Sequence, residues 1–231
     1  YTAEYTKCDN PTGLIGDPYV GKKYGEIWGY KVDGLFRNDK EAAEYASRID
    51  LSTVASGYYT ATGAYGKGVR GGDIKYLDLN GDNIVNGGKG TLDDPGDRRV
   101  IGNSSPRYQY GASLNFSWYG FDVSVFMQGI GRLDWYPGAD NLRFWGPYCR
   151  PYATFVPKNF MSQVWSEENP DAYFPRARAY TSLNSNSGTA YYTNDRYLQN
   201  LAYCRLKNLT IGYTIPRRLT SKVGIKECRI Y

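Results

Sequence analysis

The sequence predicts an all-β fold, in which antiparallel strands form a section of a transmembrane β-barrel with long extracellular loops. Residues 106–129, PRYQYGASLNFSWYGFDVSVFMQG, alternate apolar and polar side chains, and a period of two is the signature of a β-strand. The first strand of this segment is long enough to cross a bilayer. Short turns at one end of the strands and long loops at the other are typical of outer-membrane barrels.

The length of the first strand favours a bilayer over a soluble core. Residues 106–119 number fourteen, and at about 3.3 Å each they extend about 46 Å, or about 33 Å in height at a tilt of about 45°. The apolar face begins and ends in aromatic side chains, which anchor lipid-facing strands at the two interfaces. We predict that the following residues face lipid: Tyr108, Leu114, Phe116, Trp118, Phe121, Val123, Val125, Leu209, Ile211 and Tyr213.

Two regions make up the first half of the chain. Residues 1–105 are predicted to form a strand and an extracellular loop with an Asp/Asn-rich segment. This region has one weak helical stretch at residues 38–49, where Asn38 or Asp39 is placed to cap the helix. Residues 106–131 form the membrane hairpin, with a tight turn near residues 119–120.

Two further regions complete the chain. Residues 132–196 form a second extracellular loop, since an irregular segment of this length is uncommon in a compact soluble domain. Residues 197–215 form a third strand, residues 216–224 a short periplasmic turn, and residues 225–231 the start of a fourth strand. Short connections on one side and long loops on the other give the chain the asymmetry of a barrel section.

Composition excludes several classes of function. The net charge of +5 comes from 28 basic and 23 acidic residues that are dispersed along the chain, so no nucleic-acid patch is evident. No stretch approaches 18 consecutive apolar residues, which excludes a transmembrane helix. The chain has no histidine, so Ser-His-Asp and Cys-His catalysis are excluded within it. We predict that the chain is not an enzyme.

Five segments, in order, resemble the C-terminal part of SusC/RagA-type TonB-linked outer-membrane transporters. The resemblance covers the chain from about residue 21 to its end. The segments are YGEIWGYKVDGLF (24–36), GDIKYLDLNGDNIVN (72–86), VIGNSSPRYQYGASLNFSWYGFDVSVFMQG (100–129), VWSEENPDAYFPR (164–176) and YCRLKNLTIGYTIP (203–216).

The resemblance implies a 22-stranded barrel in the cell outer membrane, plugged by an N-terminal domain and driven by TonB. It also implies a SusD-like surface lipoprotein as partner, and nutrient uptake of oligosaccharides (glycans) or peptides as the function. This chain would hold about four of the strands, and the plug and the TonB-contacting segment are absent from it. We therefore expect a fragment, because unpaired strand edges cannot close a barrel.

The Asp/Asn-rich segment has the spacing of half a calcium loop. Asp78, Asn80 and Asp82 supply oxygens at relative positions 1, 3 and 5, and the backbone carbonyl of Ile84 stands at position 7. Position 12 is a lysine, so the missing acid would come from the following insertion, through Asp93, Asp94 or Asp97, of which we choose Asp94. A turn of solvated Asp and Asn side chains is the equal alternative to Ca²⁺.

Aromatic residues make up 16% of the chain, with 24 tyrosines, and this bias suits barrel girdles and sugar-binding loops. The aromatic rings of the second loop have two interpretations. In one, they stack on sugars or peptide side chains; in the other, which we favour, they pack the loop itself. The predicted substrate-binding residues are Trp135, Tyr136, Trp145, Tyr148 and Tyr152.

A rival interpretation from another class is a secreted, calcium-dependent carbohydrate-binding β-sandwich. Alternating strands, aromatics and an Asp-rich loop all suit it. The two interpretations differ at the apolar strand face, which contacts lipid in a barrel and a second sheet in a sandwich. Pairing of Cys8, Cys149, Cys204 and Cys228 is left open, because their spacing fits neither a metal site nor one disulfide pattern.

Overall fold

The computed structural model describes residues 3–60, 68–150, 152, 154, 156–178 and 188–231. Strands dominate the regular structure and helices are few and short, as the all-β prediction requires. The chain divides into two compact units. We call residues 105–134 and 200–231 the sheet unit, and residues 2–104 and 135–199 the loop unit.

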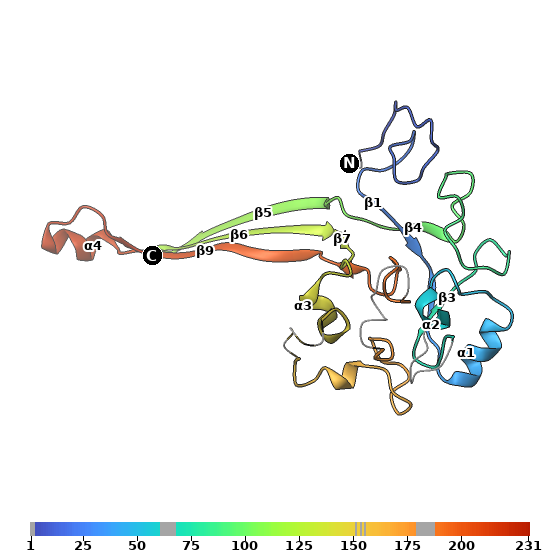
Figure 1. The fold of residues 1–231 in the computed structure, drawn as a ribbon. Coiled ribbons are helices and arrows are strands. Elements are labelled where there is room, and N and C mark those ends of the chain that lie inside the picture. Colours follow the sequence, from blue (N-terminus) through green and yellow to red (C-terminus); the bar gives the residue numbers. More distant parts are fainter. Residues whose placement is uncertain (1–2, 61–67, 151, 153, 155, 179–187) are drawn as a thin grey trace. The chain divides into compact units, whose positions relative to one another are not determined.

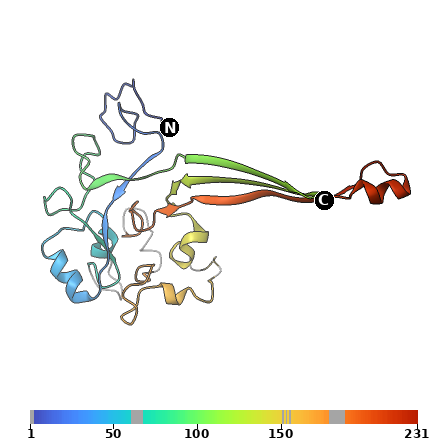
Figure 2. The same cartoon turned by 180° about the vertical axis from the view of Figure 1, so that it is seen from behind.

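The sheet unit is an open antiparallel sheet with strand order β10-β9-β6-β5. Its three long strands have 12 residues each, so each extends about 40 Å at about 3.4 Å per residue. They run side by side in both ribbon views (Figure 1, Figure 2). The strands are β5 (Arg107–Trp118), β6 (Phe121–Arg132), β9 (Tyr203–Thr214) and β10 (Arg229–Ile230).

A two-residue turn joins β5 to β6, as the sequence predicts. Trp118 and Phe121 are directly opposite each other, and the turn residues Tyr119 and Gly120 both have positive φ, at 46° and 88°. Two left-handed residues match the right-handed twist of the flanking strands, which is why this turn type is favoured in hairpins. Gly120 adopts its conformation freely, whereas Tyr119 does so at a steric cost.

A bulge interrupts the pairing of β9 with β6. Phe126 pairs with Asn208 and Met127 pairs with Leu206, so Lys207 has no opposite residue. An extra residue in one strand changes which side chains share a face beyond it. The bulge therefore places Leu206 on the same face as Leu209, although the two lie three positions apart.

The connection after β9 is helical rather than a simple turn. It contains α4 (Arg217–Thr220) and the 3₁₀ helix η4 (Ser221–Val223), which ends at Gly224 with φ 75°. The amide of Ile225 still donates to the carbonyl of Thr220 at 3.1 Å. The fourth strand lies within the predicted residues 225–231, but it begins later, at Arg229 as β10, because residue 225 completes the helical turn.

The loop unit contains two short antiparallel pairs. In the first, β1 (Glu26–Tyr30) pairs with β4 (Arg98–Asn103), and in the second, β2 (Val32–Leu35) pairs with β3 (Ile74–Tyr76). Both pairs contain a register irregularity. Two short strands, β7 (Asp134–Trp135) and β8 (Gln199–Asn200), lie where the chain passes between the units.

The longest helix among the described residues, α1 (Asp39–Ala46), falls within the predicted helical stretch. The Asn38 side chain accepts a hydrogen bond from the Glu41 amide at 2.9 Å, and the Glu41 carboxylate accepts one from the Arg37 amide at 2.7 Å. This reciprocal cap satisfies amides that lack partners within the helix. The other helical elements are α2 (Ser56–Thr60), α3 (Leu142–Trp145), η1 (Gly146–Tyr148) and η2 (Met161–Gln163).

The core of the described structure lies in the loop unit and is rich in aromatic rings. Trp145, Tyr76 and Tyr197 are fully buried there. Other buried members are Tyr30, Phe36, Leu51, Val54, Tyr58, Ile74, Val85, Tyr148 and Phe174. In the part of the chain that the structure describes, none of the helices has the length and apolar character that a membrane crossing requires.

Candidate functional site

Nine of the ten residues predicted to face lipid lie in three cross-strand rows of the sheet unit. Directly opposite residues of an antiparallel pair project from the same face, and alternate residues of one strand do too. The register therefore places all nine on one face of the sheet. The rows are Leu114–Val125–Leu209, Phe116–Val123–Ile211 and Trp118–Phe121–Tyr213.

A fourth row extends this surface. Ala112 pairs with Met127, and Met127 pairs with Leu206 across the bulge. We call these four rows the apolar face. Its outer side chains are exposed, with 62% of the Leu114 and 58% of the Ile211 surface accessible. Contiguous exposed apolar area of this kind marks a surface that meets another apolar phase or partner.

The opposite face of the sheet is polar. Asn115, Ser124 and Thr210 form one row, and Ser117, Asp122 and Gly212 form the next. Asp122 forms an ion pair with Arg229. Phe126 and, farther along β6, Ile130 are large apolar exceptions on this face. One apolar and one polar face is the arrangement that a period of two produces.

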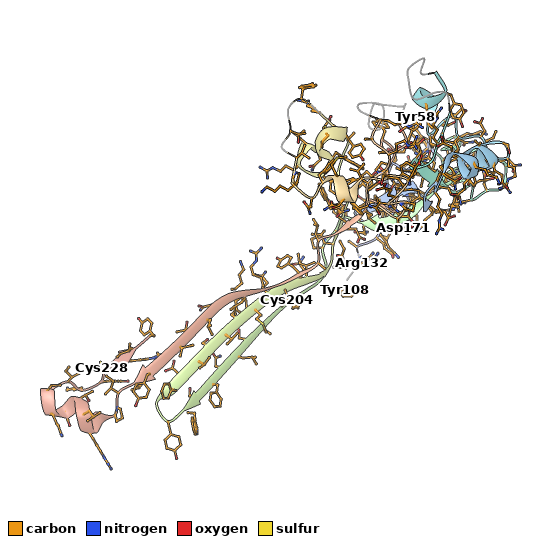
Figure 3. All side chains as sticks on the ribbon, turned by 90° about the horizontal axis from the view of Figure 1, so that it is seen from below. Tyr58, Tyr108, Arg132, Asp171, Cys204 and Cys228 are labelled. Carbon is orange, nitrogen blue, oxygen red and sulfur yellow. The ribbon has the colours of Figure 1, made fainter. Side chains whose placement is uncertain are left out.

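Tyr108, the tenth predicted residue, lies where the alternation is interrupted. Its φ is 54°, and the register passes from Arg107–Arg132 to Gln109–Ile130. Its side chain is exposed and is labelled near the start of β5 in Figure 3. Because the backbone is left-handed at this position, register alone does not assign Tyr108 to either face. Its contact with lipid stays a prediction.

Aromatic rings gather at the turn end of the apolar face. Trp118 and Tyr119 meet edge to face with 5.2 Å between ring centroids, and Phe121 and Tyr213 lie 4.5 Å apart. Indole and phenol groups combine an apolar ring with a polar tip, which suits an interface between water and an apolar phase.

Two of the predicted substrate-binding residues belong to the core of the loop unit. Trp145 is fully buried and donates from Nε1 to the carbonyl of Gly138 at 3.1 Å. Tyr148 is buried and donates from its hydroxyl to the carbonyl of Pro175 at 2.5 Å. Burial raises the pKa of Tyr148 above its usual range, so this hydroxyl stays a neutral donor. In this structure both rings pack inside the loop unit. This agrees with the interpretation in which the aromatic side chains of the second loop pack the loop itself.

The other three predicted residues are more accessible. Tyr136 is half-buried, and its hydroxyl donates to the carbonyl of Tyr192 at 3.0 Å. The exposed fraction is 37% for Trp135 and 75% for Tyr152. These two side chains keep the surface that ligand stacking needs, and the substrate-binding role of all five residues stays a prediction.

The Asp/Asn-rich segment forms a chain of side-chain-to-backbone turns. Asp78 accepts from the amides of Gly81 at 2.7 Å and Asn83 at 2.9 Å. Asp82 accepts from the Ile84 amide at 2.8 Å. Asn83 has φ 66°, the left-handed geometry that a calcium loop places at its sixth position. These hydrogen bonds hold the segment in a tight series of turns.

The fifth predicted calcium ligand lies in a separate turn. Asp94 accepts from the Lys89 amide at 3.3 Å. The neighbouring Asp97 is fully buried, and accepts from the amides of Leu79 at 2.7 Å and Asn86 at 2.9 Å. Among the described residues, no three His, Cys, Asp or Glu side chains are grouped to hold a metal ion. Calcium binding stays a prediction.

A buried ion pair joins distant segments of the loop unit. Arg178 donates to both carboxylate oxygens of Asp73, at 2.9 Å from Nε and 2.5 Å from Nη2, and both side chains are at least 98% buried. The Arg178 guanidinium also lies 4.1 Å from the centroid of the Tyr58 ring. Burial raises the pKa of Asp73 from 3.8 to about 6, although the guanidinium opposes the shift.

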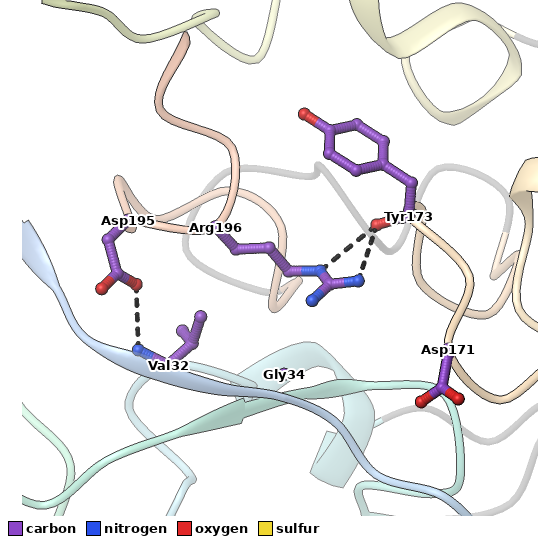
Figure 4. Close-up of a pocket in the computed structure, with 6 residues that line it drawn as sticks. All are labelled: Val32, Gly34, Asp171, Tyr173, Asp195 and Arg196. Carbon is purple, nitrogen blue, oxygen red and sulfur yellow. Dashed lines mark hydrogen bonds between the residues drawn. The ribbon is translucent and has the colours of Figure 1, made fainter. Parts of the chain in front are cut away.

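An open pocket of about 470 Å³ lies in the loop unit (Figure 4). Arg196 crosses it and donates to the carbonyls of Ala172 at 2.6 Å and Tyr173 at 3.1 Å. Asp195 accepts from the Val32 amide at 3.1 Å and pairs with Lys31. Asp171 also lines the pocket. The guanidinium and the carboxylates that line this pocket are groups that can donate to and accept from the polar groups of a ligand.

Sequence reasoning missed two parts of this arrangement. Leu206 joins the apolar face only because of the bulge at Lys207, and a bulge leaves no sign in an apolar pattern. Asp73 and Arg178 are 105 positions apart, and nothing local to either residue indicates the partner. The rest of the apolar face was predictable from the alternation of apolar and polar residues in the sequence, which has a period of two.

Comparison with known proteins gives distant relatives. No model of a protein family matches the chain. Three curated proteins of Formosa agariphila are similar to it: "TonB-dependent receptor P26" is 28% identical over 160 residues, "TonB-dependent receptor P3" is 24% identical over 211, and "TonB-dependent receptor P39" is 27% identical over 222. These matches cover 69%, 91% and 88% of this chain.

The chain spans 14% to 20% of the length of these relatives. All three are named as TonB-dependent receptors, and together they support the TonB-dependent receptor family for this chain.

Proposed function

We propose that the chain is a C-terminal barrel section of a SusC-like, TonB-dependent importer in the cell outer membrane, and that its apolar face contacts lipid. The observation that carries this proposal is the set of cross-strand rows, which puts exposed apolar side chains on one face of 12-residue strands and polar ones on the other. The three relatives named as TonB-dependent receptors support the family.

The physical argument concerns where each face is stable. An apolar surface gains about 25 cal/mol for each Å² that leaves water, and every backbone group within a bilayer must find a partner inside the protein. Long antiparallel strands meet the second condition once their edges are paired. In a barrel of this kind the apolar face would lie against acyl chains, and the polar face would line the interior.

The two units would then have different functions. The sheet unit supplies the wall, and the loop unit supplies part of the substrate chamber and the contact with a SusD-like lipoprotein. Energy would come from TonB acting on a plug domain elsewhere in the full-length protein. The substrates would be oligosaccharides or peptides, which aromatic loops with mixed hydrogen-bonding groups can bind. We assign no catalytic residue.

Extraction behaviour of the full-length protein tests the proposal. We expect the protein in the membrane fraction after salt and alkaline washes, and in solution only with detergent. In vesicles of lipids brominated on their acyl chains, we expect Trp118 fluorescence to be quenched, with a Trp118→Phe variant as the reference for the other tryptophans. Solubility without detergent would contradict the proposal and favour the β-sandwich.

A further inference from the structure

The connection between β9 and β10 is a compact, closed structure, which we call the basic turn (residues 216–228). The Ile215 amide donates to the Cys228 carbonyl at 2.9 Å and closes its base. Thr220 is buried inside it, and Gly224 ends its helical part with φ 75°. Figure 1 shows α4 beyond the end of β9. The basic turn therefore holds its side chains on an ordered backbone.

The charge of the basic turn is strongly one-sided. Its cations are Arg217, Arg218, Lys222 and Lys226, its one acid is Glu227, and four minus one gives a net charge of +3. All four cations are exposed. Among the residues that the structure describes, none of the four forms an ion pair, whereas Arg229 in the adjoining strand pairs with Asp122. The positive field of the turn is thus left uncompensated.

The same turn exposes large apolar side chains. The accessible fraction is 59% for Leu219, 70% for Val223 and 46% for Ile225. A turn that meets only water gains nothing from three such side chains in thirteen residues. Exposed aliphatic groups interleaved with Lys and Arg are instead the composition of segments that lie in the interface of an anionic membrane.

The position of the basic turn fits an interface. The Thr214 amide donates to the Gly120 carbonyl at 2.7 Å, so the basic turn and the β5–β6 turn lie at the same end of the sheet. The aromatic rings of Trp118, Phe121 and Tyr213 end the apolar face there. Along the sheet toward this end, the apolar rows come first, the aromatic rings next and the cations last. A membrane protein presents its side chains in the same order from the bilayer core to the water.

We propose that the basic turn binds the headgroups of anionic phospholipids, with Leu219, Val223 and Ile225 set at the boundary of the acyl chains. The inference rests on the proposed function, because it requires the sheet unit to lie in a bilayer. Arg217 and Arg218 offer paired N–H groups to phosphate oxygens, while Lys222 and Lys226 act as point charges. The phospholipids concerned are those of the leaflet that the short turns face.

Lipid selectivity at the protein surface tests the inference. The full-length protein is reconstituted in phosphatidylcholine vesicles with a trace of spin-labelled phosphatidylglycerol or spin-labelled phosphatidylcholine. The motionally restricted fraction of each label gives their relative association constant. We expect a several-fold preference for phosphatidylglycerol at low salt that falls toward one as salt screens the charges. This salt titration of the unaltered protein needs no variant to fold.

A charge-removal variant locates the preference. Replacing the four cations by Arg217→Gln, Arg218→Gln, Lys222→Gln and Lys226→Gln is expected to bring the ratio close to one. The matched control removes four exposed cations of the loop unit, Lys40→Gln, Lys89→Gln, Arg143→Gln and Lys158→Gln, and is expected to keep the preference. If motionally restricted lipid is seen but shows no preference for phosphatidylglycerol, this inference alone is overturned. The same holds if the preference survives in the variant that lacks the four cations of the basic turn. No restricted component at all overturns the proposed function as well.

Discussion

Phe116 of β5 lies directly opposite Val123 of β6, so both side chains project from the same face of the sheet. This one relationship fixes the faces of the paired residues from Gln109 to Ile130, because the side-chain period is two. A slip of one residue would place Asn115 and Ser117 on the apolar face and Phe116 among the polar residues. The hairpin turn at Tyr119 and Gly120 prevents that slip by setting the register.

A charge in the middle of the apolar face should destabilise the membrane-inserted protein. We expect Leu114→Arg to lower the free energy of unfolding from vesicles by about 2–4 kcal/mol, because an exposed cation is costly near the bilayer midplane. Urea unfolding of the full-length protein in lipid vesicles measures it. Asn115→Arg, one position along on the polar face, is the matched control and should cost much less. Equal losses would argue against a lipid-facing surface.

The buried pair of Asp73 and Arg178 predicts a pH dependence within the loop unit. The folded pKa of Asp73, about 6, lies above its ordinary 3.8. The folded state therefore binds the proton more tightly, and this contribution to stability is fully present below pH 3.8 and lost as pH rises through about 6. The charged groups facing this carboxyl are the guanidinium groups of Arg178 and Arg176.

The local stability near Asp73, measured as a function of pH, tests whether this contribution falls as pH rises. Hydrogen exchange of the amides of residues 70–76, corrected for intrinsic rates, is compared between the unaltered protein and Asp73→Asn at a series of pH values. The advantage of the unaltered protein over the variant should shrink as pH rises to about 6, and then stay level. An advantage that grows with pH would show that the ionised pair is the stabilising form.

Trp145 and Tyr152 should respond differently to truncation. We expect Trp145→Ala to lower the stability of the loop unit by about 3–5 kcal/mol, because the indole is fully buried. Tyr152→Ala should change stability by about 1 kcal/mol or less, since the ring is 75% exposed. Chemical denaturation followed by tryptophan fluorescence measures the two values. A neutral Trp145→Ala would return this residue to the set of candidate ligand contacts.

The Asp78–Ile84 loop predicts a calcium content that elemental analysis can measure. We expect bound calcium in the purified full-length protein after buffer exchange, and a lower content in Asp82→Ala, because that change removes the ligand at position 5. Asn38→Ala, far from the loop in the sequence, serves as a control for general destabilisation. Calcium content that is absent, or unchanged in Asp82→Ala, leaves the loop as hydrogen-bonded turns.

Sequence patterns predicted the elements whose cause is local. The period of two in residues 106–129 predicted β5, β6 and the turn between them, and Asn38 predicted the start of α1. One element was missed although the contacts that close it are local. Helix α4 follows Pro216 because the Thr220 carbonyl and Gly224 close a helical turn, while the residue pattern there suggested only a polar connection.

The same division holds within the candidate site. The rows of the apolar face follow from alternation, except for Leu206, whose face depends on a bulge set by pairing with β6. The burial of Trp145 depends on Tyr197, whose ring centroid lies 4.9 Å from that of Trp145. Tyr197 comes from a segment more than 50 positions later in the chain. Aromatic residues in a loop have the same composition whether they pack or bind, so only the tertiary contacts separate the two uses.

Spin-label accessibility along β5 tests the central claim most directly. Nitroxides are placed one at a time at residues 113–117 of the full-length protein, in vesicles and in a background without native cysteines. The account predicts a period of two, with labels at Leu114 and Phe116 accessible to oxygen dissolved in the bilayer and labels at Ser113, Asn115 and Ser117 accessible to a water-soluble nickel complex. The opposite phase, or no alternation, would contradict it.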